Sequence, residues 1–571
     1  MNKTTPAFLL ADLYVEEMLK RSPETSTMVG DHSQDNLLDD YSYPAIKKEL
    51  EFCNSYLEKF QAVELQNAQD ELAIKLIISD LNSTINSLTS NHEMLAYGVF
   101  NSPMNELREL FDFMEYQNQE DYQKLLARLN LLPETLTAWL RSLVTFQGKG
   151  VVNSKRNVKE LIRQALTIFE NKSYTTFVVE NLKNYKGVLE ENLPQELKDA
   201  ATHADLLHYF LAVSIEDELL TDAREEDGVG EKAYQLFAQD YTYPEVDLDE
   251  LYLYGEKEVK SIAIRMHEVA RAILPNYSSL SEVTEYLNNH PNYKIIGKDN
   301  LVAKLRAFTD DAISALNGVE FDIPAEILNV DILLNEDSLD ASPYYTPPSE
   351  DLSRNGATWF PTMGRDEFTI WEQLSTWYHE GVPGHHLQCG TQAMQGDNLT
   401  RYQRIVAWHS GYGEGWALYS ERLMDELGFY VDPGYMFGYL QAQMLRAARI
   451  VIDLGLHTKK YDNSTQEWNF DTAVNFLKEV ALLDQQYAIS EVNRYLSAPG
   501  QAISYKVGER VWLELRNLYL STLGDQAELK SFHAYALSLG SLPLDLFKSE
   551  VKSWITLQKE KVSNSIALSL S

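Results

Sequence analysis

The sequence predicts a large, mainly α-helical protein that contains a small antiparallel strand element. Apolar residues recur at three- and four-residue intervals through most of the 571 residues, which is the periodicity of amphipathic helices. Short β-prone runs occur between residues 320 and 362, and the helical periodicity returns from residue 366 onward. A chain of this length can bury one large hydrophobic core or two fused ones.

The first 320 residues are interpreted as a helical scaffold half, because they contain no group of residues typical of a chemical site. Residues 247–273 form a long amphipathic helix that begins with an acidic turn. The other predicted helical stretches are residues 45–95, 103–148, 157–191 and 194–221. The expected breaks between helices are at Pro103, Pro133, Pro194 and Pro275.

Residues 321–571 are interpreted as the half that carries the chemistry, within what we expect to be one continuous domain with a cleft. The runs EILNVDILL (326–334) and GATWFPTM (356–363) predict strands, and the turn-rich segment 341–356 separates them. The helices expected after them are residues 366–388, 398–427, 433–457, 470–497 and 502–523.

Composition excludes several classes of partner. The formal net charge of −36 argues against nucleic acid and against an anionic membrane surface, which both bind clusters of Lys and Arg. Cys53 and Cys389 are the two cysteines, too few for a disulfide framework. The N-terminal residues resemble an amphipathic helix rather than a signal peptide, and no apolar run reaches the roughly 18 residues of a membrane span. We therefore expect a soluble, cytoplasmic protein.

Residues 379–386 read HEGVPGHH, which is a zinc-hydrolase motif with altered spacing. In a helical HExxH motif the two histidines lie four residues apart on one face, with the Glu beside them as general base. Here Pro383 occupies the position of the second histidine, and histidines follow at 385 and 386. On a straight helix His379 and His386 would lie about 10.5 Å apart along the axis, too far to share one ion. Pro383 and Gly384 are therefore expected to break the helix and to turn a later histidine back towards His379.

A third ligand is expected on the next helix, because a catalytic zinc ion usually has three protein ligands. Glu414 is the best candidate, since Gly411 and Gly413 before it allow another backbone to approach closely. Glu421, two turns later, is interpreted as a solvated residue or as a partner of a ligand. The alternative is that the motif is an ordinary helix turn whose histidines are satisfied by hydrogen bonds. Trp416 and Tyr419 are interpreted as core residues.

Six stretches carry a family resemblance: SPETSTMVGDH (22–32), YYTPPSEDLSRNGATW (344–359), YHEGVPGHHLQ (378–388), GEGWALYSE (413–421), LRAARIVIDLGLH (445–457) and EVNRYLSAPGQAISYKVGE (491–509). In these stretches the chain resembles the DUF885 family, a gluzincin-like group related in fold to helical metallopeptidases. The resemblance implies that His379, His385 and Glu414 bind one zinc ion and that Glu380 is the general base. The strand element would then lie next to the metal-binding helix.

The resemblance also implies that Tyr505 stabilises the oxyanion, with His386 lining the site. His386 and His457 are candidate helpers of Tyr505. The candidates for binding the substrate are Arg494, His457 and Arg449, and the further candidates for anchoring a substrate carboxylate are Arg354 and Arg446.

These residues predict a zinc-dependent hydrolase that cleaves peptide or peptide-like amide bonds of a small substrate. One alternative is a metal-dependent amidase, lactamase or esterase that acts on a small modified metabolite. Another is a metal-free binding protein with a degenerate site. The sequence does not fix the length of the substrate, exo- against endo-cleavage, or the oligomeric state.

Overall fold

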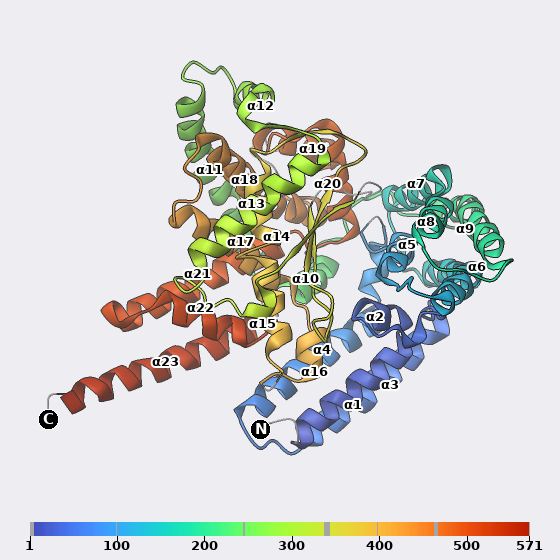
Figure 1. Ribbon diagram of the computed structural model, residues 1–571, viewed down its shortest axis with the longest axis horizontal. Helices are drawn as coiled ribbons and strands as arrows, with labels where there is room; N and C mark the ends of the chain where they lie inside the picture. Colours follow the sequence, from blue (N-terminus) through green and yellow to red (C-terminus); the bar gives the residue numbers. More distant parts are fainter. Residues whose placement is uncertain are drawn as a thin grey trace.

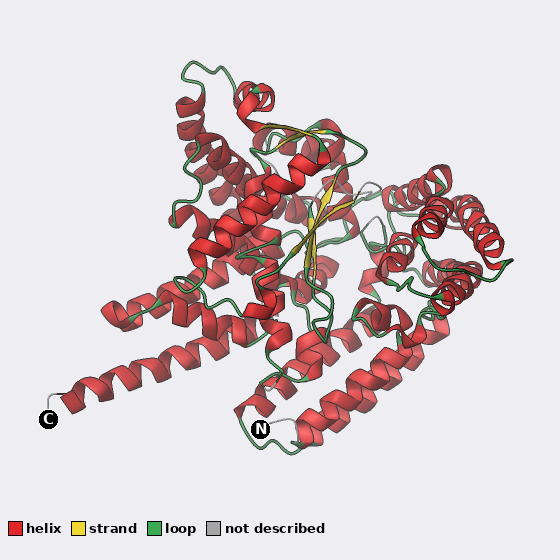
Figure 2. Ribbon diagram, in the orientation of Figure 1, coloured by secondary structure: helices red, strands yellow, loops and turns green. Residues whose placement is uncertain are grey.

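The computed structural model describes residues 5–98, 100–243, 246–335, 343–396, 398–461 and 466–569. Helices make up most of the fold, and a few short strands lie near the middle of the molecule in the view of Figure 2. The helices before the first strand are α1 (Pro6–Arg21), α2 (Pro23–Met28), α3 (Tyr43–Ala62), α4 (Ala68–Ser90), α5 (Pro103–Leu110), α6 (Gln119–Gly148), α7 (Lys155–Asn171), α8 (Ser173–Asn184), α9 (Leu193–Ile215), α10 (Glu231–Tyr241), α11 (Leu248–Ile273) and α12 (Leu280–Asn289).

A second series of helices follows β1. Its members are α13 (Lys298–Leu316), α14 (Gln373–Glu380), α15 (His385–Met394), α16 (Arg401–Ile405), α17 (Ser410–Glu426), α18 (Pro433–Thr458), α19 (Phe470–Val480), α20 (Gln485–Ser497), α21 (Ser504–Leu523), α22 (Leu529–Ser538) and α23 (Leu544–Ser569). The mainly helical fold class is thereby confirmed. The helices that were not predicted from the sequence are α2, α10, α12, α13, α22 and α23.

Local signals explain where the long helices begin. The Asp247 side chain accepts hydrogen bonds from the Asp249 and Glu250 amides at the start of α11. Asp432 caps α18 in the same way, and the proline that follows it occupies the first helical position, where no amide donor is needed.

Pro133 does not break a helix, contrary to our expectation. It lies inside α6, which runs for 30 residues. Buried residues of α6 occur on both sides of it, including Leu129, Leu132, Leu136 and Leu140. The burial of both halves against one core offsets the lost hydrogen bond and the ring clash that proline causes inside a helix.

The strands form two small sheets. β1 (Lys294–Ile296) pairs antiparallel with β5 (Glu367–Thr369). In the other sheet β4 (Ala357–Pro361) is central: β3 (Tyr344–Thr346) pairs with it antiparallel and β2 (Asp331–Asn335) pairs with it parallel. The two predicted strands correspond to β2 and β4, and they pair parallel, so the expected antiparallel arrangement is wrong for them. The antiparallel partner of β4 is β3, which lies in the segment predicted to be turn-rich, and β5 lies within the predicted helix 366–388.

Two hydrophobic cores organise the helices. The smaller core is formed by residues between 104 and 223 on α5 to α9, which gather on one side of the molecule in Figure 1. The larger core joins residues 7–81 to residues 234–555 and includes α11, α17, α18 and α21. Neither core begins or ends at residue 320. The division at that residue into a scaffold half and a half that carries the chemistry stays a prediction.

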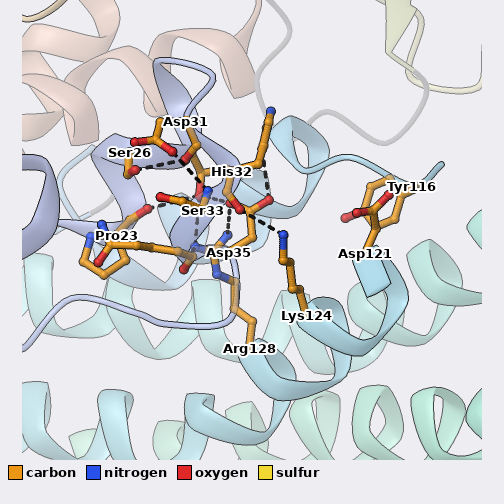
Figure 3. A network of polar contacts seen from close by, with 12 residues as sticks. Pro23, Ser26, Asp31, His32, Ser33, Asp35, Tyr116, Asp121, Lys124 and Arg128 are labelled. Atoms are coloured by element: carbon orange, nitrogen blue, oxygen red, sulfur yellow. Dashed lines mark hydrogen bonds and ion pairs between the residues drawn. The ribbon is translucent and has the colours of Figure 1, made fainter. Parts of the chain in front are cut away.

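Arg128 of α6 joins the smaller core to the segment that follows α2 (Figure 3). Its buried guanidinium donates to the Leu37 carbonyl at 2.9 Å and to the Thr27 hydroxyl at 3.0 Å, and lies 3.8 Å from Asp35. Thr27 also donates to Asp35 at 2.6 Å, and His32 lies 3.0 Å from the same carboxylate. The motif at residues 22–32 is thus part of a buried polar network.

Replacing Arg128 with Met is expected to lower the free energy of unfolding by about 3–5 kcal/mol, because the buried Asp35 carboxylate loses its positive partner. Denaturant unfolding followed by circular dichroism measures the change. The control is Arg141→Met, an exposed position on the same helix, which we expect to change stability by less than about 0.5 kcal/mol. Equal stability of the two variants would contradict this role of Arg128.

Candidate metal centre

The helix that carries the motif breaks between its histidines, as expected. α14 ends at Glu380 and α15 begins at His385. Gly384 packs directly on the end of α14: its amide donates to the Tyr378 carbonyl at 3.0 Å, and a Cβ at this position would lie 1.9 Å from the His379 carbonyl oxygen. Only glycine fits this approach. The break places His385 beside His379, with 4.9 Å between the ring centroids.

Trp416 and Ser420 of α17 hold this break in place. The Trp416 indole donates to the carbonyls of Pro383 and Gly384 at 3.0 and 3.1 Å, and the Ser420 hydroxyl lies 3.4 Å from the Pro383 carbonyl. Trp416 is fully buried, which confirms its interpretation as a core residue. It also keeps α17 in register with the motif.

Close packing of α17 against α21 positions the carboxylate of Glu414. A Cβ on Gly508 of α21 would lie 1.9 Å from the Gly411 carbonyl and 2.6 Å from the Gly415 Cα. The expected close approach therefore occurs at Gly411, while Gly413 faces the Trp408 ring. α17 consequently presents Glu414 to the two histidines.

His379, His385 and Glu414 form a group that fits a metal ion. One ligand atom from each lies within 4.8 Å of the others. Glu414 Oε2 is 3.2 Å from His379 Nε2 and 3.6 Å from His385 Nε2. Tetrahedral zinc with bonds of about 2.0–2.1 Å requires ligand atoms about 3.3 Å apart. The two carboxylate–imidazole distances are close to this spacing, so the group fits a metal ion, and it contains His385 rather than His386.

Glu421 orients the His379 ring through a hydrogen bond to its Nδ1 atom. Its Oε1 accepts from His379 Nδ1 at 2.8 Å, its Oε2 accepts from the Ser375 hydroxyl at 2.5 Å, and Arg446 lies 4.0 Å away. Glu421 is fully buried, so its interpretation as a solvated residue is wrong, and its hydrogen bond to His379 fits the other interpretation, a partner of a candidate ligand. A carboxylate on Nδ1 fixes the tautomer that leaves Nε2 free to bind a metal. Ser375 was not among the site residues predicted from the sequence.

The ionisable groups of this cluster shift one another's pKa values. Burial acts to lower the pKa of His379, but the Glu414 and Glu421 carboxylates outweigh it and raise the pKa to about 10. Burial acts to raise the pKa of Glu414, but the facing histidines hold the pKa well below its usual value. The pKa of Glu380 is raised, mainly by burial. These shifts are typical of a cluster built to hold charge.

Replacing Glu421 with Gln is expected to weaken zinc binding about 10- to 100-fold, because His379 loses the anionic partner that raises its basicity. Competition with a chromophoric chelator measures the affinity. The matched control is Glu426→Gln on the same helix, where the carboxylate is half exposed and paired with Arg516. An unchanged affinity in the Glu421 variant would show that this carboxylate does not support the ligand.

Tyr505 lies beside the cluster together with two predicted arginines. Its ring stacks on His379 with 6.1 Å between centroids, and its hydroxyl accepts from Arg494 at 3.2 Å. The Arg449 guanidinium lies 4.8 Å from the ring centroid. Arg449 donates twice to Glu491, at 3.0 and 2.8 Å. The structure therefore brings Tyr505, Arg449 and Arg494 together next to His379.

His386 and His457 have roles other than those expected. Nε2 of His386 donates to the Ile327 carbonyl at 2.8 Å and its Nδ1 is 3.0 Å from the Tyr345 hydroxyl, so that the ring ties α15 to the sheet. His457 is fully buried at the end of α18: its Nε2 lies 3.1 Å from the Tyr495 carbonyl, and its Nδ1 accepts from the Val229 amide at 3.2 Å. Both rings have their two nitrogens engaged, and neither is free to help Tyr505 or to bind substrate.

Arg354 and Cys389 do not belong to the candidate metal-binding group. Arg354 donates to the Pro347 carbonyl in its own loop and lies over the Phe113 ring, with no contact to the cluster among the described residues. Cys389 is free, and burial together with the nearby Glu380 and Glu414 raises its pKa to about 12. It therefore stays a neutral thiol.

Fold and site together define a large helical protein with a candidate metal centre. The chain belongs to the DUF885 family, described as bacterial proteins of unknown function, whose model matches residues 23–551. Among curated proteins, none matches the sequence.

Two solved structures share the fold. A putative lipoprotein from Colwellia psychrerythraea is 21% identical, with 97% of this chain and 99% of that chain covered and a TM-score of 0.84. A putative lipoprotein of unknown function from Shewanella oneidensis is 18% identical, with 95% and 98% covered and a TM-score of 0.70. Within the described residues, no helix is long and apolar enough to cross a membrane.

Proposed function

We propose that this protein is a zinc-dependent hydrolase that cleaves peptide or peptide-like amide bonds. The observation that carries the proposal is the convergence of His379, His385 and Glu414 at zinc-ligand spacing, with Glu380 next in the chain to a ligand. Zinc at such a site polarises a carbonyl group and lowers the pKa of water towards 7. One ion per chain suffices.

Glu380 is the general base of the proposal. It is half-buried at the end of α14, and none of the described residues donates a hydrogen bond to its carboxylate. The charges of His379, His385 and Glu414 all act on the pKa of Glu380, which supports a role for this carboxylate beside the cluster. A carboxylate with a raised pKa and no partner can take a proton from water and pass it to a leaving amine.

Tyr505 is the oxyanion donor of the proposal. Its hydroxyl oxygen accepts from Arg494, and none of the described residues accepts its proton. Arg494 thereby orients the phenol so that its O–H can point to a substrate. A donor held in this way stabilises negative charge that develops on a carbonyl oxygen.

Elemental analysis and a substrate panel test the proposal. We expect about one zinc ion per purified chain, and hydrolysis of short peptides that stops on chelation and returns with zinc. Faster cleavage of non-peptide amides or esters than of any peptide would favour the amidase, lactamase or esterase alternative. A chain that holds no metal under gentle purification would favour the metal-free binding protein.

The location and partners are part of the same proposal. A small peptide or peptide-like substrate fits a buried cluster, and the cytoplasmic location stays a prediction. Both similar structures are of putative lipoproteins, which favours the alternative of a lipid-anchored location for this chain. Cell fractionation distinguishes the two.

A further inference from the structure

Three arginines next to the candidate metal centre have fewer carboxylate partners than they need. Arg449 and Arg494 share the single carboxylate of Glu491: Arg449 donates two hydrogen bonds to it, and Arg494 lies 3.9 Å away. Arg446 faces Glu421 at 4.0 Å, and that carboxylate already accepts from His379 and Ser375.

The positive charges at this site, with a zinc ion bound, would outnumber the negative charges by one. Among the described residues, the carboxylates within 4.0 Å of the three arginines are those of Glu491 and Glu421, and the two charges of a zinc ion would be balanced by Glu414 and Glu380. A buried charge without a counter-ion is costly. One positive charge therefore remains for an anion from outside, although the chain as a whole carries a net charge of −36.

Unused donors lie on Arg494 and Arg446. The Nε atoms of both are buried and have no hydrogen-bond partner. The Arg494 side chain is 20% exposed and its guanidinium lies over Phe100, whose own side chain is exposed, so that Arg494 can be reached from solvent. A guanidinium offers its donors as a fork that matches a carboxylate.

We propose that Arg494, with Arg446 deeper in the site, forms a subsite for a substrate carboxylate beside the metal centre. Tyr505 connects the two parts, because it touches Arg494 through its hydroxyl and His379 through its ring. The inference rests on the proposed hydrolase function and narrows its substrates to peptides with a carboxylate close to the scissile bond. The carboxylate belongs either to the C-terminus or to an acidic side chain.

Binding to a protein that cannot turn over tests the subsite. The probes are N-acetyl-Ala-Ala, its C-terminal amide, and N-acetyl-Ala-Glu-amide, titrated calorimetrically into the zinc-loaded Glu380→Gln variant. We expect at least one carboxylate probe to bind about 10-fold or more tightly than the amide, as one charge-assisted hydrogen bond allows. The free acid and the Glu side chain distinguish the two sources of the carboxylate.

A second substitution in the Glu380→Gln protein shows which residue causes the preference for the carboxylate probe. Arg494→Gln should remove the preference and Arg494→Lys should restore part of it, while Glu491 keeps Arg449 as its partner. Arg510→Gln is the matched control, since Arg510 pairs with Glu250 away from the site. Melting curves confirm that each variant is folded.

The outcomes separate the two proposals. Equal binding of acid and amide, including no binding of either, or a preference that survives Arg494→Gln, would overturn the carboxylate subsite. A wild-type protein that prefers the acid but hydrolyses no substrate, with zinc bound, would overturn the hydrolase function and leave the subsite standing.

Discussion

Replacing Glu380 with Gln is expected to lower kcat by about 10²- to 10⁴-fold, which is the range for a lost general base. Gln keeps the size of the side chain but cannot take a proton from water. The ligands His379, His385 and Glu414 remain, so the variant should still hold about one zinc ion per chain. Initial rates on the best peptide of the panel, together with elemental analysis, measure both effects.

Two controls accompany this variant. Glu380→Asp keeps the carboxylate but withdraws it by one methylene, so we expect activity between that of the wild type and that of the Gln variant. Glu367→Gln removes an exposed carboxylate of strand β5 that pairs with Lys294 of strand β1, and it should leave the rate unchanged. If Glu380→Gln keeps its activity with zinc bound, another group must be the base.

The site could be predicted from the sequence where the backbone chemistry was distinctive. Pro383 and Gly384 indicated a helix break, and the break explains how His385 reaches His379 across six positions. The spacing alone left His385 and His386 open, because the exit angle of the loop decides which ring turns inward. His386 forms hydrogen bonds with Ile327 and Tyr345, which lie far away in the sequence, so the local pattern does not contain these contacts.

Glu421 shows why burial is hard to judge from one helix. It lies two turns after Glu414 and therefore on the same face, a signal that could have placed it at the cluster. A charged residue in a helix is ordinarily solvated, so the sequence left a solvated residue and a partner of a ligand both open. Only the packing of α14 and α18 against α17 makes this position buried.

For the fold as well, local features could be predicted from the sequence and contacts between distant segments could not. Periodicity located most of the helices, because an amphipathic stripe is a local property of the sequence. It misjudged Pro133, where both halves of α6 pack on the smaller core, and it could not give the parallel pairing of β2 with β4. Both depend on contacts between distant segments, which the pattern of one segment does not contain.

Replacing His385 with Ala is expected to lower the zinc content from about one ion per chain to below about a tenth, because two protein ligands hold zinc far less tightly than three. Activity should fall with it. The neighbouring variant His386→Ala is the matched control: it should keep zinc and lose about 1–3 kcal/mol of stability, since the Ile327 carbonyl and the Tyr345 hydroxyl lose their partner.

The pair of variants also decides which histidine is the ligand. Elemental analysis gives the zinc content, and denaturant unfolding gives the stability of the same preparations. If His386→Ala loses zinc while His385→Ala retains it, the roles of the two residues are reversed from those in the structure. In that case zinc binding must turn α15, which would break the hydrogen bonds of His386 to the sheet and to the Ile327 carbonyl. If both variants keep zinc, the cluster of His379, His385 and Glu414 is not where the metal binds.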